Sequence, residues 1–197
     1  FDSPYQAYSA CAGNPYFIDL DILKEKGLLT KAELAAQRFD SERVDYGRLF
    51  NERYAVLHTA YSRFTPDRAY KAFIKRAAGW LDDYALFMAL KEKHDGKPWY
   101  EWEPELAMRD KKALDAAKKE LSEEIELHSF IQFVFTQQWQ ALKAYANQNS
   151  VEIIGDMPIY VAYDSADVWV SPQLFALDEN KRPIEVAGCP PDPFSPT

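Results

Sequence analysis

The sequence predicts an α/β fold that is predominantly helical and holds one helix–strand unit of the kind that repeats in βα barrels. Apolar residues recur at helical spacing over residues 128–149. A short β-branched run at residues 151–154 follows, and it stops at Gly155 and Asp156. Residues 20 to about 125 show only helical patterns, so a helical block precedes the helix–strand unit.

The first half of the helical block carries clear start and stop signals. A short helix over residues 19–26 ends at Gly27, which suits the left-handed C-cap position. Thr30 and Glu33 have the spacing of a capping box and open the next helix. Helical spacing returns over residues 46–64.

The second half of the block contains three further helices. Thr65 and Pro66 have the pattern of an N-cap followed by proline at the first helical position. A helix over residues 80–93 ends before the breaker DGKP at residues 95–98. Residues 110–126 are dominated by Ala, Lys and Glu, and they predict a helix with a mostly solvated face.

The segment after the helix–strand unit predicts short caps and a hairpin. Asp164 and Asp167 lie in a DSAD stretch, so helix capping accounts for both carboxylates. Residues 174–177 and 184–186 flank a turn at residues 178–183 and predict the two arms of a hairpin.

Composition and length exclude several classes of protein. A complete eightfold barrel needs about 250 residues, and this chain has 197. The net charge of −8 argues against a nucleic-acid partner, because such binding draws on clustered Lys and Arg. No apolar run reaches the roughly 20 residues of a membrane-spanning helix. Cys11 and Cys189 lie far apart, which favours reduced thiols in a cytoplasmic protein.

Asp156 is the strongest candidate for a functional side chain. It ends a hydrophobic strand, and ligands of βα barrels gather at the carboxyl ends of the strands. Paired carboxylates suit a glycoside-processing enzyme, although spacing alone does not make Asp156 and Asp192 such a pair. Trp99, Tyr100 and Trp102 offer rings that suit sugars, but packing under a loop is the better interpretation. Nucleotide, serine-hydrolase and Cys/His metal motifs are missing from the sequence, so we expect no cofactor and no metal.

Seven motifs, spread from end to end and in the right order, resemble those of the amylomaltases, the bacterial and plant 4-α-glucanotransferases. They are SPYQ at residues 3–6, AGNP at 12–15, LDDYALF at 81–87, PWYEW at 98–102, GDMPI at 155–159, DSADVW at 164–169 and AGCPPD at 187–192.

The resemblance implies part of a (β/α)8 TIM barrel with a large all-helical insertion. Residues 1–19 would form a loop at the barrel top near the donor sugars, and residues 20–125 the helical insertion. Residues 126–157 would supply a helix–strand unit of the barrel. Residues 158–197 would form a subdomain after the strand and the start of a loop that arches over the cleft.

The resemblance also implies a retaining transglycosylase that passes α-1,4-glucan segments between maltooligosaccharides. The substrate-binding residues it implies are Ser3, Tyr5, Gln6, Asp156, Asp192 and Phe194. Tyr5 would stack on a sugar ring. The family's nucleophile, acid/base and third catalytic carboxylate would lie beyond Thr197, so no residue of this chain is expected to be catalytic.

The sequence leaves other classes open. Because the chain begins at Phe1 without Met and ends in a proline-rich loop, we expect an internal segment of a longer protein, inactive in isolation. A non-catalytic glucan-binding module that uses Tyr5, Asp156 and residues 190–195 is one alternative, and a helical interaction domain is another. Neither nucleic acid nor membrane is an expected partner, and we expect self-association through open strand edges.

Overall fold

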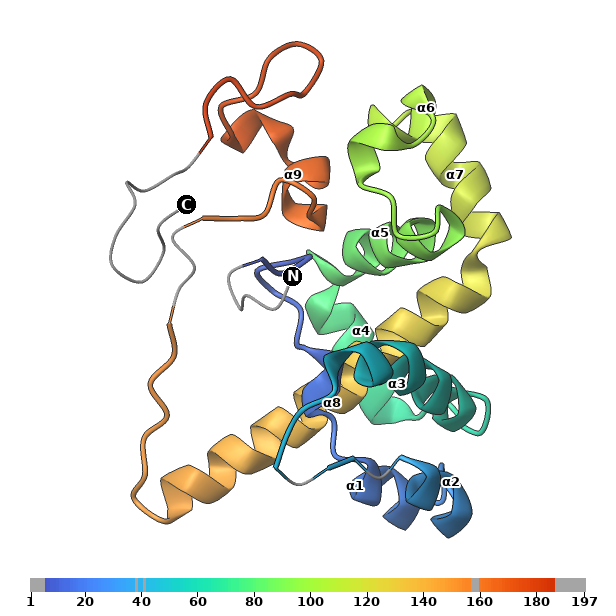
Figure 1. Cartoon of the computed structure of the whole chain (residues 1–197), viewed down its shortest axis with the longest axis vertical. Coiled ribbons are helices and arrows are strands. Elements are labelled where there is room, and N and C mark those ends of the chain that lie inside the picture. The colour runs from blue at the N-terminus through green and yellow to red at the C-terminus, as the bar shows by residue number, and fades with distance from the viewer. Residues whose placement is uncertain (1–5, 38, 41, 157–159, 187–197) are drawn as a thin grey trace. The chain divides into compact units, whose positions relative to one another are not determined.

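The computed structural model describes residues 6–37, 39–40, 42–156 and 160–186 (Figure 1). This part of the chain is mostly helical, as predicted. Its α-helices are α1 (Leu20–Glu25), α2 (Lys31–Ala36), α3 (Tyr46–Tyr61), α4 (Arg68–Ala77), α5 (Leu81–Lys93), α6 (Pro104–Ala107), α7 (Lys111–Glu120), α8 (Ser122–Gln148) and α9 (Ala166–Val170). Short 3₁₀ turns are η1 (Pro15–Phe17), η2 (Trp99–Glu101) and η3 (Pro172–Leu174).

The chain forms two compact units. Unit 1 comprises Phe1–Ala10, Lys91–Ala116 and Asp156–Thr197, and unit 2 comprises Cys11–Leu90 and Ala117–Gly155. None of the helices in the described part of the chain combines the length and apolar composition that crossing a bilayer requires.

The predicted helix signals near the start of unit 2 are confirmed. The carboxylate of Asp19 caps α1 by accepting a 2.8 Å hydrogen bond from the backbone N–H of Asp21. Gly27 follows with φ of 74°, the left-handed conformation that glycine adopts without strain. Thr30 and Glu33 form both bonds of the capping box that opens α2.

One predicted helix start and one predicted helix continuity are wrong. α4 begins at Arg68 rather than after Thr65, because Asp67 accepts a 2.7 Å bond from the N–H of Tyr70 and so supplies the cap. The charged pattern over residues 110–126 is divided between two helices. Leu121, with φ −103° and ψ 28°, interrupts it between α7 and α8.

Aromatic side chains form the centre of unit 2. Phe130 and Phe133 of α8 lie 4.8 and 5.9 Å from Phe64 between ring centroids. Tyr70 and Phe73 of α4 contact Phe133 at 5.2 and 5.7 Å. Figure 1 shows α3 and α4 against α8, the long helix that carries the shared rings. Burial of each such ring contributes about 1.5–3 kcal/mol, and tilted pairs add to it.

Two glutamines of α8 hold the segment that precedes α1. Gln132 accepts from the N–H of Gly13 (2.8 Å) and donates to its carbonyl (3.0 Å). Gln138 forms the same pair of bonds with Asp19, at 2.7 and 3.0 Å. A Cβ on Gly13 would lie 2.0 Å from the ring of Phe135, so this close approach requires glycine. α8 therefore fixes the AGNP motif from one side.

Indole rings form the core of unit 1. The side chains of Trp99, Trp102 and Trp169 are all buried. Their indole N–H groups donate to the carbonyls of Tyr163 (2.8 Å), Lys97 (3.0 Å) and Leu106 (3.0 Å), respectively. These buried donors are therefore all satisfied by backbone, which fixes each ring in one orientation. The prediction that the aromatic stretch at residues 98–102 packs under a loop is confirmed for Trp99 and Trp102.

The predicted buried strand at residues 151–154 is wrong for this chain. Residues 151–156 are exposed, with Ile154 at 93%, and form no ladder. Trp139, Leu142 and Tyr145, on the predicted apolar face of α8, are exposed as well. A parallel strand requires hydrogen-bonding neighbours and a cover on both faces, and the described residues provide neither.

The predicted hairpin is present only as a turn. The backbone N–H of Asp178 donates to the carbonyl of Arg182 (2.8 Å), and the N–H of Ile184 donates to the carbonyl of Ala176 (2.9 Å). Within residues 160–186 the pairing amounts to one isolated antiparallel bridge, between Leu177 and Pro183. Asp178 caps the turn by accepting bonds from backbone N–H groups of the turn itself.

Candidate functional site

Two of the six predicted substrate-binding residues, Gln6 and Asp156, belong to the described part of the chain, and both are exposed members of unit 1. Ser3, Tyr5, Asp192 and Phe194 lie outside the described residues. Asp156 was expected at the end of a buried strand, but it ends an exposed segment instead.

The segment that follows Gln6 is held by α9. The N–H of Ala166 donates to the carbonyl of Tyr8 at 2.8 Å. The carboxylate of Asp167 accepts a 2.8 Å bond from the N–H of Ala10, 157 residues away in the sequence. The DSADVW motif therefore holds the chain two to four residues after Gln6.

The two aspartates of this motif do not cap α9, so that interpretation of the sequence is wrong. Ser165, fully buried, is the N-cap, and its hydroxyl accepts from the N–H of Val168 at 3.3 Å. Serine serves the cap as well as aspartate does. Asp164 and Asp167 are thereby left for partners far along the chain.

Lys91 is the centre of the polar contacts beside α9. Its ammonium lies 2.6 Å from a carboxylate oxygen of Asp164 and donates to the carbonyls of Gly96 (2.8 Å) and Lys97 (3.1 Å). The side chain of Lys91 is only 4% exposed, against 28% for Asp164. The ammonium also lies 5.0 Å from the centre of the Tyr8 ring, within cation–π range.

The second oxygen of Asp164 extends this arrangement to η2, because it accepts a 3.2 Å bond from the N–H of Trp99. Lys91 thus has an anion, two carbonyls and an aromatic face around it, which is what a buried charge requires. The contacts join the end of α5, the DGKP turn, η2 and the segment before α9.

A pair of stacked tyrosines adds an aromatic surface to unit 1. Tyr100 and Tyr163 have ring centroids 4.6 Å apart and are inclined by 13°. The hydroxyl of Tyr163 donates to the carbonyl of Lys181 at 2.6 Å, and burial raises the pKa of this hydroxyl. Burial lowers the pKa of the Lys181 ammonium, and nearby Arg109 adds to the effect. Tyr100 is 39% exposed, although Tyr163 covers one face of its ring.

The contacts of Asp164 and Asp167 with the rest of unit 1 indicate structural roles for both carboxylates. Asp164 is engaged by Lys91 and by the N–H of Trp99, and Asp167 is engaged by the N–H of Ala10. A glycoside-cleaving pair needs one carboxylate that can attack and one that can donate a proton. Neither aspartate is arranged for those tasks.

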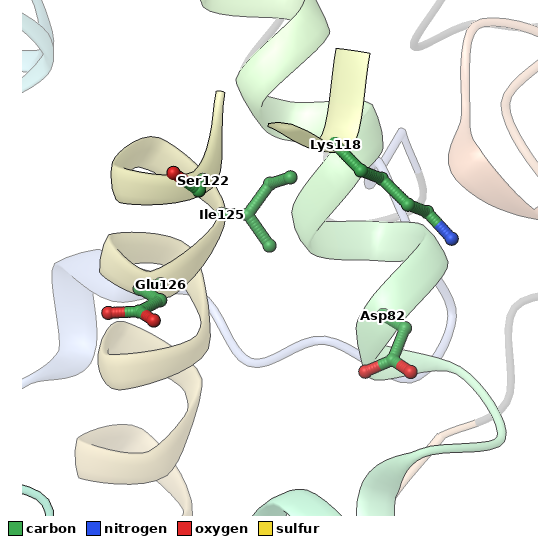
Figure 2. Close-up of a pocket in the computed structure, with 5 residues that line it drawn as sticks. All are labelled: Asp82, Lys118, Ser122, Ile125 and Glu126. Carbon is green, nitrogen blue, oxygen red and sulfur yellow. The ribbon is translucent and has the colours of Figure 1, made fainter. Parts of the chain in front are cut away.

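A separate cavity of about 270 Å³ lies in unit 2 (Figure 2). It is lined by Asp82, Lys118, Ser122, Ile125 and Glu126. Glu126 also accepts a 3.0 Å bond from the hydroxyl of Tyr61. Neither Gln6 nor Asp156 belongs to the wall, and no aromatic ring forms part of it among the described residues, so this cavity does not coincide with the predicted site.

Sequence reasoning missed Lys91, and it assigned Asp164 and Asp167 to helix capping instead of to this arrangement. Lys91 could have been found from the sequence, because it directly follows the apolar run at residues 84–90, which is buried in α5. A lysine that continues such a run needs an anion or hydrogen-bond acceptors for its ammonium. Asp167 carried none, since its partner lies 157 residues away.

The whole chain matches a known family. A family model described as 4-alpha-glucanotransferase matches residues 1–197. The 4-alpha-glucanotransferase of Thermus thermophilus is 50% identical over 202 residues, and that of Clostridium butyricum is 47% identical over 201 residues. Both alignments cover 100% of this chain but 40% and 41% of the relatives, so the chain spans about two fifths of their length.

A solved structure agrees with these relatives. The amylomaltase of Streptococcus agalactiae, in complex with acarbose, matches with a TM-score of 0.92 at 42% identity. The match covers 98% of this chain and 40% of that one. The motifs, the fold and the relatives agree, and the chain belongs to the 4-alpha-glucanotransferase family.

Proposed function

We propose that this chain forms a substrate-binding portion of a 4-α-glucanotransferase, an enzyme that moves α-1,4-glucan segments between maltooligosaccharides by retaining double displacement. The observation that carries the proposal is the family match over residues 1–197, together with the α9 contacts that hold the segment after Gln6. The relative solved with acarbose, from Streptococcus agalactiae, supports a carbohydrate ligand.

In this proposal unit 1 binds and orients the glucan. Ser3, Tyr5, Gln6, Asp156, Asp192 and Phe194 contact sugars, and the carboxylates of the double displacement come from outside these 197 residues. Residues 1–19 belong to the top of a (β/α)8 barrel, residues 20–125 to its helical insertion, and residues 126–157 to its helix–strand unit. The assembled enzyme is cytoplasmic, and it needs no cofactor and no metal.

The exposed apolar surface of unit 2 supports an assembly larger than this chain. Trp139, Leu142 and Tyr145 on α8 and Ile154 beyond it are exposed. Large apolar side chains exposed in this way are typical of an interaction surface. In the complete enzyme the rest of the barrel covers these side chains. In the isolated chain they cause self-association, in place of the open strand edges expected from the sequence, because residues 151–156 form no strand. An Ile154→Lys variant is expected to shift the chain toward monomer in sedimentation velocity.

A chimera tests the proposed function. The 197 residues replace the matching segment of the Thermus thermophilus relative, and both the chimera and the isolated chain are incubated with maltotriose. The chimera is expected to release glucose and form longer oligosaccharides, whereas the isolated chain does neither. A chimera that melts cooperatively but transfers nothing would reject the proposal, and so would turnover by the chain alone.

Asp156→Ala in the chimera tests the role of the second described site residue. Interactions that must be made at the transition state affect kcat as well as binding, so both kcat and affinity are expected to fall. Normal turnover by a folded Asp156→Ala chimera would remove Asp156 from the site.

A further inference from the structure

Asp167 joins two parts of unit 1 that are distant in sequence. Its carboxylate and the N–H of the adjacent Ala166 together bind residues 8–10, each at 2.8 Å. The two bonds meet alternate residues of that segment, so they fix both its position and its orientation. Gln6 lies two residues before Tyr8, so holding Tyr8 limits how far Gln6 can move from this segment.

The side that carries Asp167 is itself rigid. Ser165 caps α9 from a fully buried position, and Asp164 binds the buried ammonium of Lys91. Trp169, also fully buried, donates its indole N–H to the carbonyl of Leu106. The carboxylate of Asp167 therefore projects from a fixed helix, and it can transmit that fixed position to residues 8–10.

We propose that Asp167 is a positioning residue, which sets the segment carrying Gln6 in the geometry that binds glucan. The inference rests on the proposed function of unit 1. Sugar hydroxyls form directional hydrogen bonds, so a binding side chain must be held within about 0.5 Å of its working position. The bond from Ala10 to Asp167 is exposed, so its loss is expected to disturb the segment far more than the fold.

Hydrogen exchange on the 197-residue chain tests the positioning directly. Asp167→Ala is expected to speed amide exchange in residues 6–10 by about fivefold, the equivalent of one hydrogen bond. Asp67→Ala is the matched control, because Asp67 also accepts a backbone N–H, at 2.7 Å, but caps α4 in unit 2. Unchanged exchange in residues 6–10 of Asp167→Ala would overturn the inference.

Kinetics in the chimera test the consequence for glucan. Asp167→Ala is expected to raise KM for maltotriose about fivefold with kcat within about twofold, the pattern of lost ground-state binding. Asp167→Asn keeps an acceptor oxygen and is expected to restore most of the affinity. Asp67→Ala is expected to leave KM unchanged.

Three results would overturn the role of Asp167 while leaving the proposed function intact. They are an unchanged KM in Asp167→Ala, equal impairment in Asp167→Asn, and an equal rise of KM in Asp67→Ala. An unsubstituted chimera that folds but transfers nothing would instead reject the proposed function, and the role of Asp167 with it.

Discussion

Each of the two units of this chain is stabilised internally by a different balance of contacts. Unit 2 is built on apolar rings, with Phe130 and Phe133 of α8 shared between neighbouring helices. Unit 1 has aromatic contacts too, such as the Tyr100–Tyr163 stack, but polar contacts also join its distant segments, as between Lys91 and Asp164 or Ala10 and Asp167. Apolar packing is non-directional, whereas a hydrogen bond fixes a direction.

This difference agrees with the roles in the proposed function, in which unit 1 binds glucan and unit 2 is the scaffold. A scaffold needs stability, which buried area supplies. A binding segment needs defined geometry, which polar contacts from a rigid element supply. Unit 2 is therefore expected to be sensitive to lost volume, and unit 1 to lost hydrogen-bond partners.

The largest effect is expected from Phe130→Ala in unit 2. Phe130 is fully buried and contacts Tyr61 and Phe64, so truncation removes apolar area and leaves a cavity. The free energy of unfolding should fall by about 3–5 kcal/mol. Urea denaturation followed by Trp fluorescence measures it. A loss below about 1 kcal/mol would show that the aromatic cluster is not the core of unit 2.

Lys91→Met is expected to be the most damaging polar change in unit 1. It leaves Asp164 without its cation and two carbonyls without their donor, at a cost of about 3 kcal/mol, toward the low end for a buried pair because Asp164 is partly exposed. Lys24→Met is the matched control, because Lys24 forms an equally short 2.6 Å pair with Asp21 at the surface. The Lys24→Met variant should melt at the same temperature as the native chain. Similar melting curves for Lys91→Met and Lys24→Met would show that burial does not determine how much these ion pairs stabilise the fold.

Gln132 and Gln138 offer a sharper comparison within α8. Both form the same two bonds to backbone, but Gln132 is fully buried and Gln138 is not. Gln132→Ala leaves buried groups unsatisfied and should cost about 2 kcal/mol, whereas Gln138→Ala should cost about 0.5–1 kcal/mol. Chemical denaturation of both variants measures the difference. Equal losses would mean that burial does not set the strength of these contacts.

The smallest effect is a pH dependence at the surface of unit 2. The Arg63 side chain, through its hydrogen bond, holds the pKa of Glu33 at about 2, below its usual 4.5. Because the pKa is lower in the folded state, the contribution of Glu33 to stability is complete above about pH 4.5 and disappears as the pH falls toward about 2. The difference in melting temperature between the native chain and Glu33→Gln should shrink over that window. A constant difference would exclude ionised Glu33 as the cause.

Several local signals in the sequence predicted local structure correctly, although the signals for a helix start at Thr65 and for aspartate caps of α9 did not. Gly27, the Thr30–Glu33 capping box and the start of α3 at Tyr46 appear where predicted, because each depends on neighbours within four residues. The apolar spacing of residues 128–149 correctly predicted a helix, but not its exposed end at Trp139, Leu142 and Tyr145. Spacing identifies a face without saying what covers it.

The candidate site was less accessible to such reasoning. The motifs correctly predicted the family, yet the partners of Asp164 and Asp167 lie 73 and 157 residues away, beyond the range of any spacing rule. The prediction of a strand at residues 151–154 was wrong for a related reason. Residues with high β-propensity form a strand only where another strand is present to pair with them.

The most direct test of the division between the units is hydrogen exchange of the chimera with and without saturating maltoheptaose. If unit 1 binds glucan and unit 2 is the scaffold, added glucan should slow exchange in residues 6–10 and in α9 while leaving α3 and α4 unchanged. Slower exchange confined to α3 and α4, with residues 6–10 and α9 unaffected, would contradict the assignment of glucan binding to unit 1.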